Sequence, residues 1–252
     1  MRCQWLALLS QSRNPGGMLS QRSSGVFGKD DTTEVRHLAT DDIDFQQLSK
    51  VISNERLTPY LLATHEDKRA ALRLYEWNVR ASGAVFELLA ILEVVLRNSL
   101  NQQLASYSLP HPAWFENPSI ELSRRAQMDI ENALRRLDMR KGDVRPSRVI
   151  TELPFGFWKY LLSKRYEATL WTQCLRHAFP ELHPQRRSLV FASVHESHFL
   201  RNRIAHHEPI FRRDLLQDSE RIFSVLEWIE PTCAQWARSL NRVELIWSQR
   251  NH

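Results

Sequence analysis

Apolar residues recur at helical spacing through most of the chain. The first run lies between 45 and 52, and Thr58-Pro59 is expected to interrupt it, because proline in a helix interior removes a hydrogen bond. A longer helical segment follows from about 66 to 104, and its middle, 84–96, is apolar nearly all round. A helix that is apolar on every side is a buried one, so we expect 84–96 to lie in the core.

Helical patterns continue towards the C-terminus. Residues 120–139 place five apolar side chains along one face, and an aromatic-rich helix starts near 154. Two more helices are predicted at 215–229 and 231–246, with Pro231 in a first turn, where proline is well accommodated. No segment alternates at period two, and no phosphate-loop or dinucleotide glycine pattern is present. With only 7 glycines, the chain is predicted to be all-α, a single helical bundle over 41–252.

Residues 1–40 are predicted to be an N-terminal extension, either disordered or added by a mistaken start. The apolar run Trp5–Leu9 is too short for the core of a signal peptide. The stretch Asn14-Pro15-Gly16-Gly17 is typical of a loop, and Met18 is an alternative start to Met1.

Charge adds a preference for an anionic partner. The net charge of +5 arises from 34 basic and 29 acidic residues, and 28 of the basic residues are arginine. Arginine suits bidentate phosphate contacts and base stacking, which favours RNA as a partner, although an arginine-rich proteome explains the same count. A basic stretch at 124–148 is compatible with a track for a phosphate backbone and equally with a solvated helix face.

Cysteine content and hydropathy bear on location. Cys3, Cys174 and Cys233 are odd in number and widely spaced, without a disulfide framework or zinc-ligand spacing, which fits a reducing cytoplasm. No apolar stretch approaches the ~20 residues that a membrane-spanning helix needs. We therefore predict a cytoplasmic protein that does not act on membranes.

The stretch 199–211 carries the candidate chemistry. A helical run beginning near Pro184 is expected to end at about His207 or Glu208, because Pro209 cannot continue it. Helical geometry divides its side chains into two faces. The face expected to point to the core holds Leu189, Ser193, Leu200 and Ile204, and the opposite face holds His195, Phe199, Asn202 and His206. Because Asn202 and His206 are four residues apart, we expect them to be neighbours, with Arg201 beside them.

The segment Arg201-Asn202-Arg203-Ile204-Ala205-His206 resembles the R-N-x-x-x-H signature of HEPN-type ribonucleases. The wider stretch, LRNRIAHHEPIF, resembles the Abi-like (abortive infection) branch of that superfamily. A second stretch, Leu92-Glu93-Val94-Val95-Leu96-Arg97-Asn98, resembles an earlier helix of the same family. The similarity covers about 43 to 240 and implies a HEPN-like helical bundle. It also implies the site: Arg201, Asn202 and His206 as catalytic residues, Arg203 and His207 as auxiliary ones, and Glu93, Arg97 and Asn98 as support from the second helix.

These residue types suit RNA cleavage by the 2′-hydroxyl of the RNA itself. The reaction needs a proton taken from that hydroxyl, a proton given to the 5′ leaving oxygen, and stabilisation of charge on the phosphate. Histidine suits both proton roles near neutrality, and a guanidinium suits the phosphate. Asn202 is available to orient His206 or a phosphate oxygen. A helix C-terminus favours a protonated His206, whereas Arg201 and Arg203 oppose it, so the sequence leaves its protonation open. No metal or other cofactor is expected.

One chain supplies one such motif. The pairing of HEPN domains implies a homodimer in which two motifs share a composite active site. The same resemblance implies a toxin-like effector of abortive infection, an anti-phage defence, which cuts cellular RNA and is held silent by an antitoxin or another regulator.

Three other interpretations stay open on the residues alone. Arg201, Asn202 and His206 can form an ordinary polar helix end, which would make the chain a non-catalytic helical module that binds RNA or protein. Glu93, Arg97 and Asn98 can instead be structural, as a buried ion pair with hydrogen bonds, since Glu93 and Arg97 are four residues apart in the favourable order. A metal site is the third, although no HExxH motif or paired cysteine accompanies its candidate ligands. Those ligands are His195, His198, His206, His207 and Glu208.

Overall fold

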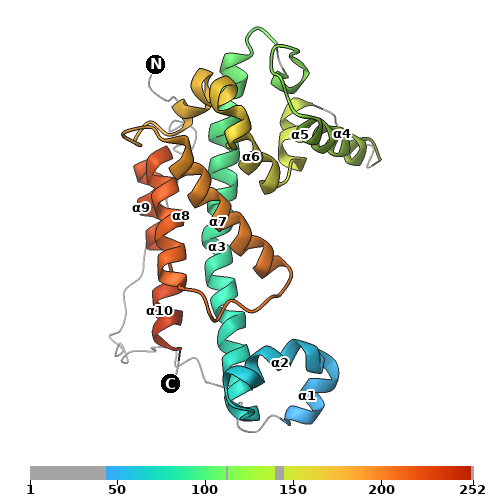
Figure 1. The fold of residues 1–252 in the computed structure, drawn as a ribbon, viewed down its shortest axis with the longest axis vertical. Helices are drawn as coiled ribbons and strands as arrows, with labels where there is room; N and C mark the ends of the chain where they lie inside the picture. The colour runs from blue at the N-terminus through green and yellow to red at the C-terminus, as the bar shows by residue number, and fades with distance from the viewer. Residues whose placement is uncertain (1–43, 112, 140–144, 251–252) are drawn as a thin grey trace, which may run out of the picture. The chain divides into compact units, whose positions relative to one another are not determined.

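The computed structural model describes residues 44–111, 113–139 and 145–250. All of them belong to one compact unit, Thr40–His252, and the expected N-terminal extension at 1–40 lies outside the described residues. All secondary-structure elements assigned among these residues are helices, which confirms the predicted all-α fold (Figure 1). No described helix is long and apolar enough to cross a membrane.

The helices follow one another with short connections. The α-helices of the described residues are α1 (Phe45–Ile52), α2 (Asn54–Ala63), α3 (Lys68–Tyr107), α4 (Arg124–Met139), α5 (Pro146–Glu152), α6 (Phe155–Leu161), α7 (Arg187–Ala205), α8 (Leu215–Ile229), α9 (Pro231–Ser239) and α10 (Val243–Ser248). Short 3₁₀-helices lie at Trp114–Glu116, Lys164–Tyr166 and Leu175–Ala178, and a short π-helix lies at Glu167–Trp171.

Helix α3 is the longest of these and packs against α2, α6, α7, α8 and α10 (Figure 1). Asp67 begins it, because its carboxylate accepts hydrogen bonds from backbone N–H groups of the first turn that have no partner within the helix. The expectation that 84–96 is buried on every side is wrong. Phe86 and Val94 are each 45% exposed, because the neighbouring helices cover the other sides of α3.

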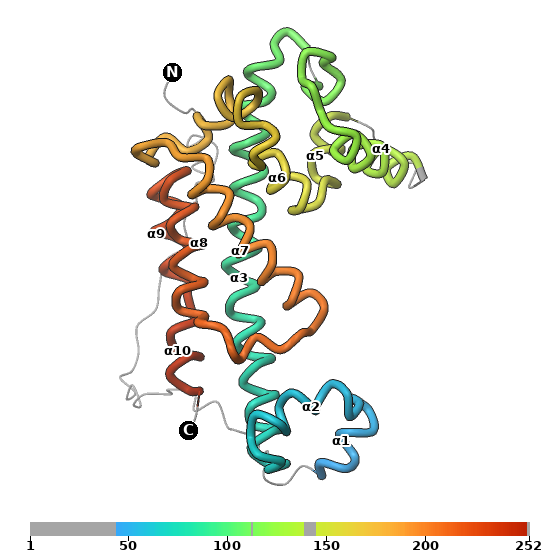
Figure 2. Tube along the Cα trace, in the orientation of Figure 1, coloured from blue at the N-terminus to red at the C-terminus, as the bar shows by residue number. Residues whose placement is uncertain are grey.

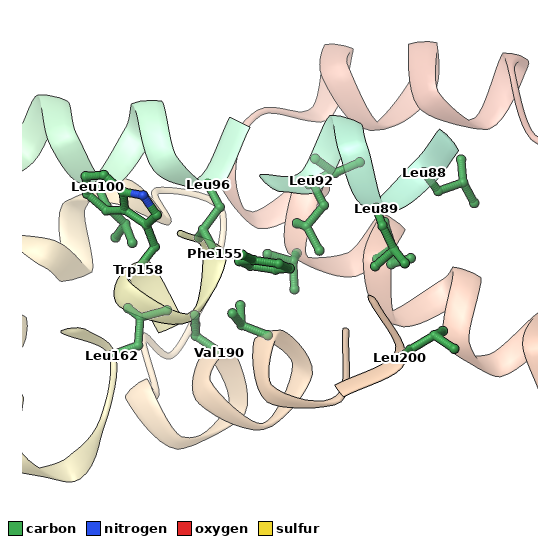
Figure 3. Packing of buried hydrophobic residues seen from close by; sticks show 14 of the residues in the cluster. Leu88, Leu89, Leu92, Leu96, Leu100, Phe155, Trp158, Leu162, Val190 and Leu200 are labelled. Carbon is green, nitrogen blue, oxygen red and sulfur yellow. The ribbon is translucent and has the colours of Figure 1, made fainter. Parts of the chain in front are cut away.

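The core forms where α3, α6 and α7 meet. Leucines spaced along α3 pack with Phe155 and Trp158 of α6 and with Val190 of α7 (Figure 3). The labelled leucines of α3 are Leu88, Leu89, Leu92, Leu96 and Leu100. All of these side chains are almost fully buried, and burying one of this size contributes about 1.5–3 kcal/mol. This packing fixes α7 against α3 and so positions the end of α7.

The first helical run is broken at Ser53 and not at Thr58-Pro59. Ser53 has a φ of 81°, a left-handed conformation that cannot continue a helix. It ends α1 and begins α2, where its hydroxyl accepts a hydrogen bond from the backbone N–H of Arg56. Pro59 lies inside α2.

Helix α7 is shorter than predicted at both ends. It begins at Arg187 and ends at Ala205. Leu200 and Ile204 face the core as expected, but Leu189 is 45% exposed. The buried stripe that contacts α3, α6 and α8 runs instead through Val190, Val194, Ser197, Leu200 and Ile204.

After α7 the chain reverses and begins α8 (Figure 2). Helix α8 has the predicted bounds, 215–229, and Pro231 begins α9 as expected. The helix predicted at 231–246 is divided into α9 and α10, since α9 ends at Ser239.

Candidate functional site

The end of α7 is held by backbone hydrogen bonds and by α2. His206 follows the last helical residue, and its N–H donates to the carbonyl oxygen of Asn202 at 2.9 Å. His207 has a φ of 55°, which turns the chain ahead of Pro209. Arg56 of α2 donates to the carbonyl oxygens of both His206 and His207. A cation there interacts favourably with the negative end of the helix dipole, so this contact stabilises the turn.

Arg201 lies against α3. Its Nε atom is 3.7 Å from Oε2 of Glu93, and 36% of its side chain is exposed. The two groups form an ion pair, but their separation is too long for a hydrogen bond, and the buried Nε of Arg201 has no hydrogen-bond partner. The structure therefore brings together two residues from separate sequence motifs, and it leaves the guanidinium with unused donors.

The other two α3 candidates do not join this pair. Glu93 contacts Arg201 and not Arg97, so the expected pairing of Glu93 with Arg97 is wrong. Arg97 instead donates from Nε to the side-chain oxygen of Asn98 at 3.4 Å. Within the described residues, neither Arg97 nor Asn98 forms a hydrogen bond or an ion pair with α7. Glu93 therefore pairs with an arginine of α7 and not with the arginine four residues later on its own helix.

Asn202 and His206 are not joined through their side chains. The amide nitrogen Nδ2 of Asn202 lies 3.4 Å from Nε2 of His198, one turn earlier on α7. The His206 imidazole is exposed, and no hydrogen bond or ion pair links it to another side chain in the part of the chain that is described. The side-chain amide of Asn202 thus has a partner one helical turn before it, and His206 is left open to solvent.

Arg203 holds the turn after α7, and His207 lies beside a cleft. The Arg203 guanidinium donates to the carbonyl oxygen of Pro209 at 2.6 Å and pairs with Glu208 at 3.3 Å. His207 and Arg201 line a cleft of about 420 Å³ between α3 and the end of α7, which we call the α3–α7 cleft. Its walls from α3 are Tyr75, Asn78, Val79, Ser82, Gly83 and Phe86.

Two residues at the site were missed as candidates for RNA chemistry. His198 of α7 and Lys159 of α6 approach to 3.4 Å, between Nδ1 and Nζ. Burial first, and then the charges of Lys159, Arg201, His195 and Arg125, lower the pKa of His198 to about 4. Burial and then Arg125 lower the pKa of Lys159. The sequence held one signal for His198, its position four residues before Asn202, but none for Lys159.

Candidate metal ligands do not converge. Across the described ranges, no three side chains of His, Cys, Asp or Glu lie close enough together to hold a metal ion. His195 and His206 are exposed, whereas His198 turns towards Lys159.

Comparison with protein-family models, with curated proteins and with solved structures found no match for this chain.

Proposed function

We propose that this chain is a metal-independent endoribonuclease that cleaves RNA through attack by the 2′-hydroxyl. The observation that carries the proposal is the setting of Arg201. Glu93 pairs with Nε of the guanidinium at the edge of the α3–α7 cleft, and 36% of the Arg201 side chain stays exposed there. Such a guanidinium suits a phosphate, because it stays charged and presents several donors in one plane.

Each step of the reaction then has a group to serve it. The 2′-oxygen attacks phosphorus while its proton passes to a base, and the bond to the 5′-oxygen breaks as that oxygen takes up a proton. The products are a 2′,3′-cyclic phosphate and a 5′-hydroxyl. Arg201 stabilises the charge on the phosphate, Asn202 donates a hydrogen bond to it, and His206, exposed at the end of α7, exchanges the proton.

A second copy of the chain completes the site in this proposal, because one His206 cannot act as base and acid at the same time. The exposed side of α3 supports such pairing. Val79, Gly83, Phe86, Ala90 and Val94 recur every three or four residues and form one exposed small and apolar stripe, the α3 stripe. The stripe runs beside Glu93 and reaches the α3–α7 cleft. Two copies packed on it would bring their Arg201 residues towards each other.

The biological role follows from the resemblance to the Abi-like branch. In this proposal the protein is a cytoplasmic, toxin-like effector of abortive infection whose substrate is cellular RNA. An antitoxin or another regulator would keep it silent until phage infection.

The test is incubation of the purified protein with total RNA and with transfer RNA in the presence of EDTA. Arg201→Ala and His206→Ala are each expected to lower the cleavage rate by about 100-fold or more, the usual size of one acid–base or electrostatic contribution. Arg186→Ala, at the other end of α7, and His177→Ala are matched controls, since both side chains are exposed. The controls should cleave like the wild type and leave 2′,3′-cyclic phosphate ends.

The exposure of His206 and its lack of a side-chain partner favour one alternative, a non-catalytic helical module that binds RNA or protein. RNA binding without cleavage by the wild type and by both variants would establish that alternative. Cleavage that EDTA abolishes would contradict the metal-independent mechanism.

A further inference from the structure

The His198 side chain is held from several sides. The ring of Phe155 lies edge-on at 5.5 Å between centroids. Gly156 makes room for the imidazole, because a Cβ atom at that position would come within 3.2 Å of Nε2. Lys159 and Asn202 then face the two ring nitrogens, each at 3.4 Å. A half-buried imidazole restrained in this way has a defined orientation rather than a choice of rotamers.

Burial, and then the charges around it, keep the His198 ring neutral. Lys159 of α6 and Arg125 of α4 face it from neighbouring helices, and Arg201 and His195 belong to its own helix. All four are cations or neutral bases, and burial disfavours a further positive charge. Near neutral pH the ring therefore carries one N–H and one lone pair.

The neighbours of His198 decide which nitrogen carries the proton. The ammonium group of Lys159 has donors only, so it donates to Nδ1, which must hold the lone pair. The proton then lies on Nε2, which faces the side-chain amide of Asn202, with Nδ2 at 3.4 Å. A charge-assisted hydrogen bond is roughly twice as strong as a neutral one, so Lys159 determines the tautomer.

This tautomer also sets the orientation of the Asn202 amide. The oxygen and nitrogen of an asparagine side chain are assigned from its hydrogen bonds. Nε2–H and Nδ2 are both donors, so they cannot form a hydrogen bond with each other. Exchanging the two ends of the amide puts Oδ1 in the place of Nδ2 and gives Nε2–H its acceptor. The amide nitrogen, with its two donors, is then turned away from His198 and is free to bind an anion beside Arg201.

We infer that Lys159 and His198 are positioning residues, which orient the side-chain amide of Asn202 so that it donates a hydrogen bond to the RNA phosphate bound at Arg201. The chain of contacts runs from the Lys159 ammonium to the His198 imidazole and on to the Asn202 amide. This inference rests on the proposed nuclease function for its catalytic consequence, but the tautomer and the amide orientation are properties of the free protein.

The first test is nitrogen NMR of protein with ¹⁵N-labelled histidine. The chain has 10 histidines, so His198→Gln identifies the signals that belong to His198. We expect a neutral ring near pH 7 with the proton on Nε2. Lys159→Met should raise the pKa of His198 and mix the two tautomers, whereas Lys164→Met, at an exposed lysine of the next turn, should leave both unchanged. A proton on Nδ1, or no response to Lys159→Met, would overturn the inference whether or not the protein is a nuclease.

The second test is kinetic. Removing an outer partner that orients a functional group costs about 10–100-fold in activity where this has been measured at metal sites. We expect Lys159→Met and His198→Gln each to lower kcat by about tenfold with little change in KM, and Lys159→Arg, which keeps a charged donor, to restore part of the loss. Asn202→Asp retains the acceptor for Nε2–H but removes the donors to the phosphate, so it should lower kcat without changing the tautomer.

An alternative role for Lys159 is direct contact with an RNA phosphate. If Lys159 makes that contact, Lys159→Met removes it. The slope of log K against log salt for binding to single-stranded RNA should then become smaller in magnitude by about 0.7. An unchanged slope supports the positioning role, and a lowered slope with an unchanged tautomer contradicts it. If the wild type does not cleave RNA, the proposed function fails, and the NMR result still decides the tautomer.

Discussion

Asp218 shows how strongly a single charge depends on its surroundings. Its side chain, on α8, is only 4% exposed. The two carboxylate oxygens accept hydrogen bonds from Arg213 and Arg221 at 2.7–2.8 Å. The bonds to Asp218 are the main reason why the pKa of Arg213 is raised. Arg213 also reaches Glu196 on α7, so this network joins the two helices that lead into and out of the turn after α7.

We expect Asp218→Asn to lower the free energy of unfolding by about 3 kcal/mol, because it removes the buried carboxylate that pairs with both Arg213 and Arg221. Glu131→Gln is the matched control, since Glu131 and Arg124 form an exposed pair worth less than about 1 kcal/mol. Urea unfolding of the three proteins measures the difference. Equal losses in the two variants would show that burial adds nothing to the Asp218 network.

His198 makes stability depend on pH. Its pKa is lowered to about 4 in the folded chain, whereas an unfolded histidine titrates near ~6.5. Above the unfolded value the ring is neutral in both states. As the pH falls from there towards the folded value, only the unfolded state takes up the proton, so the free energy of unfolding decreases across that window.

His198→Gln should remove this component and leave those of the other titrating groups. We expect the stability difference between wild type and His198→Gln to change by on the order of 1 kcal/mol between about pH 7 and pH 4.5, a figure reduced for solvent screening because the ring is half exposed. Unfolding by urea at several pH values measures it. A difference that is constant with pH would contradict the lowered pKa.

At the scale of elements, α3 combines two functions in one helix. One side supplies the leucines of the core, and the other side presents the α3 stripe and Glu93. Gly83 lies in the middle of that exposed side, where a Cβ atom would meet nothing within 4 Å. Glycine inside a helix is unfavourable, and here the chain's own packing does not require it.

Gly83→Ala is therefore expected to stabilise the isolated chain by about 1 kcal/mol, measured by thermal unfolding at low protein concentration. Gly156→Ala is the contrasting variant, because its Cβ atom would press on His198, and it should destabilise the protein or displace the ring. A loss of stability in Gly83→Ala would mean that something packs closely against Gly83.

At the scale of the whole molecule, the proposed function depends on a second copy. The α3 stripe is exposed in the single chain, and it lies next to Arg201 at the α3–α7 cleft. An interface between two copies at the α3 stripe would therefore couple dimerisation to the site. An exposed apolar residue elsewhere, such as Leu245 on α10, has no such relation to the site and serves as a reference.

We expect light scattering to give the mass of a dimer for the wild type. Phe86→Glu should weaken association by more than about tenfold and lower RNA cleavage with it, because it would bury an unpaired charge at the contact. Leu245→Glu should leave the mass and the activity unchanged. A Phe86→Glu protein that stays dimeric would place the interface on another surface, and an active monomer would contradict the composite site.

Local patterns predicted the helices well and their ends less well. The bounds of α8 and the start of α9 follow directly from apolar spacing and from Pro231. The break at Ser53 does not, because a left-handed φ at a serine has no strong sequence signal, whereas Pro59 has one and is accommodated inside α2. Leu189 was predicted to face the core because it and the next residue, Val190, are both apolar and lie near the face of Leu200 and Ile204, and the structure buries Val190.

The sequence by itself determined that the chain is helical and that Arg201, Asn202 and His206 stand at the end of one helix, because both properties depend on residues close together in the chain. Only the tertiary structure decided which of them meet other side chains. Glu93 reaches Arg201 from α3, Lys159 reaches His198 from α6, and Asn202 faces His198 instead of His206. The tertiary structure also decided that one side of α3 stays exposed. These contacts depend on how the core leucines place the helices against each other, and no spacing within a single helix encodes that placement.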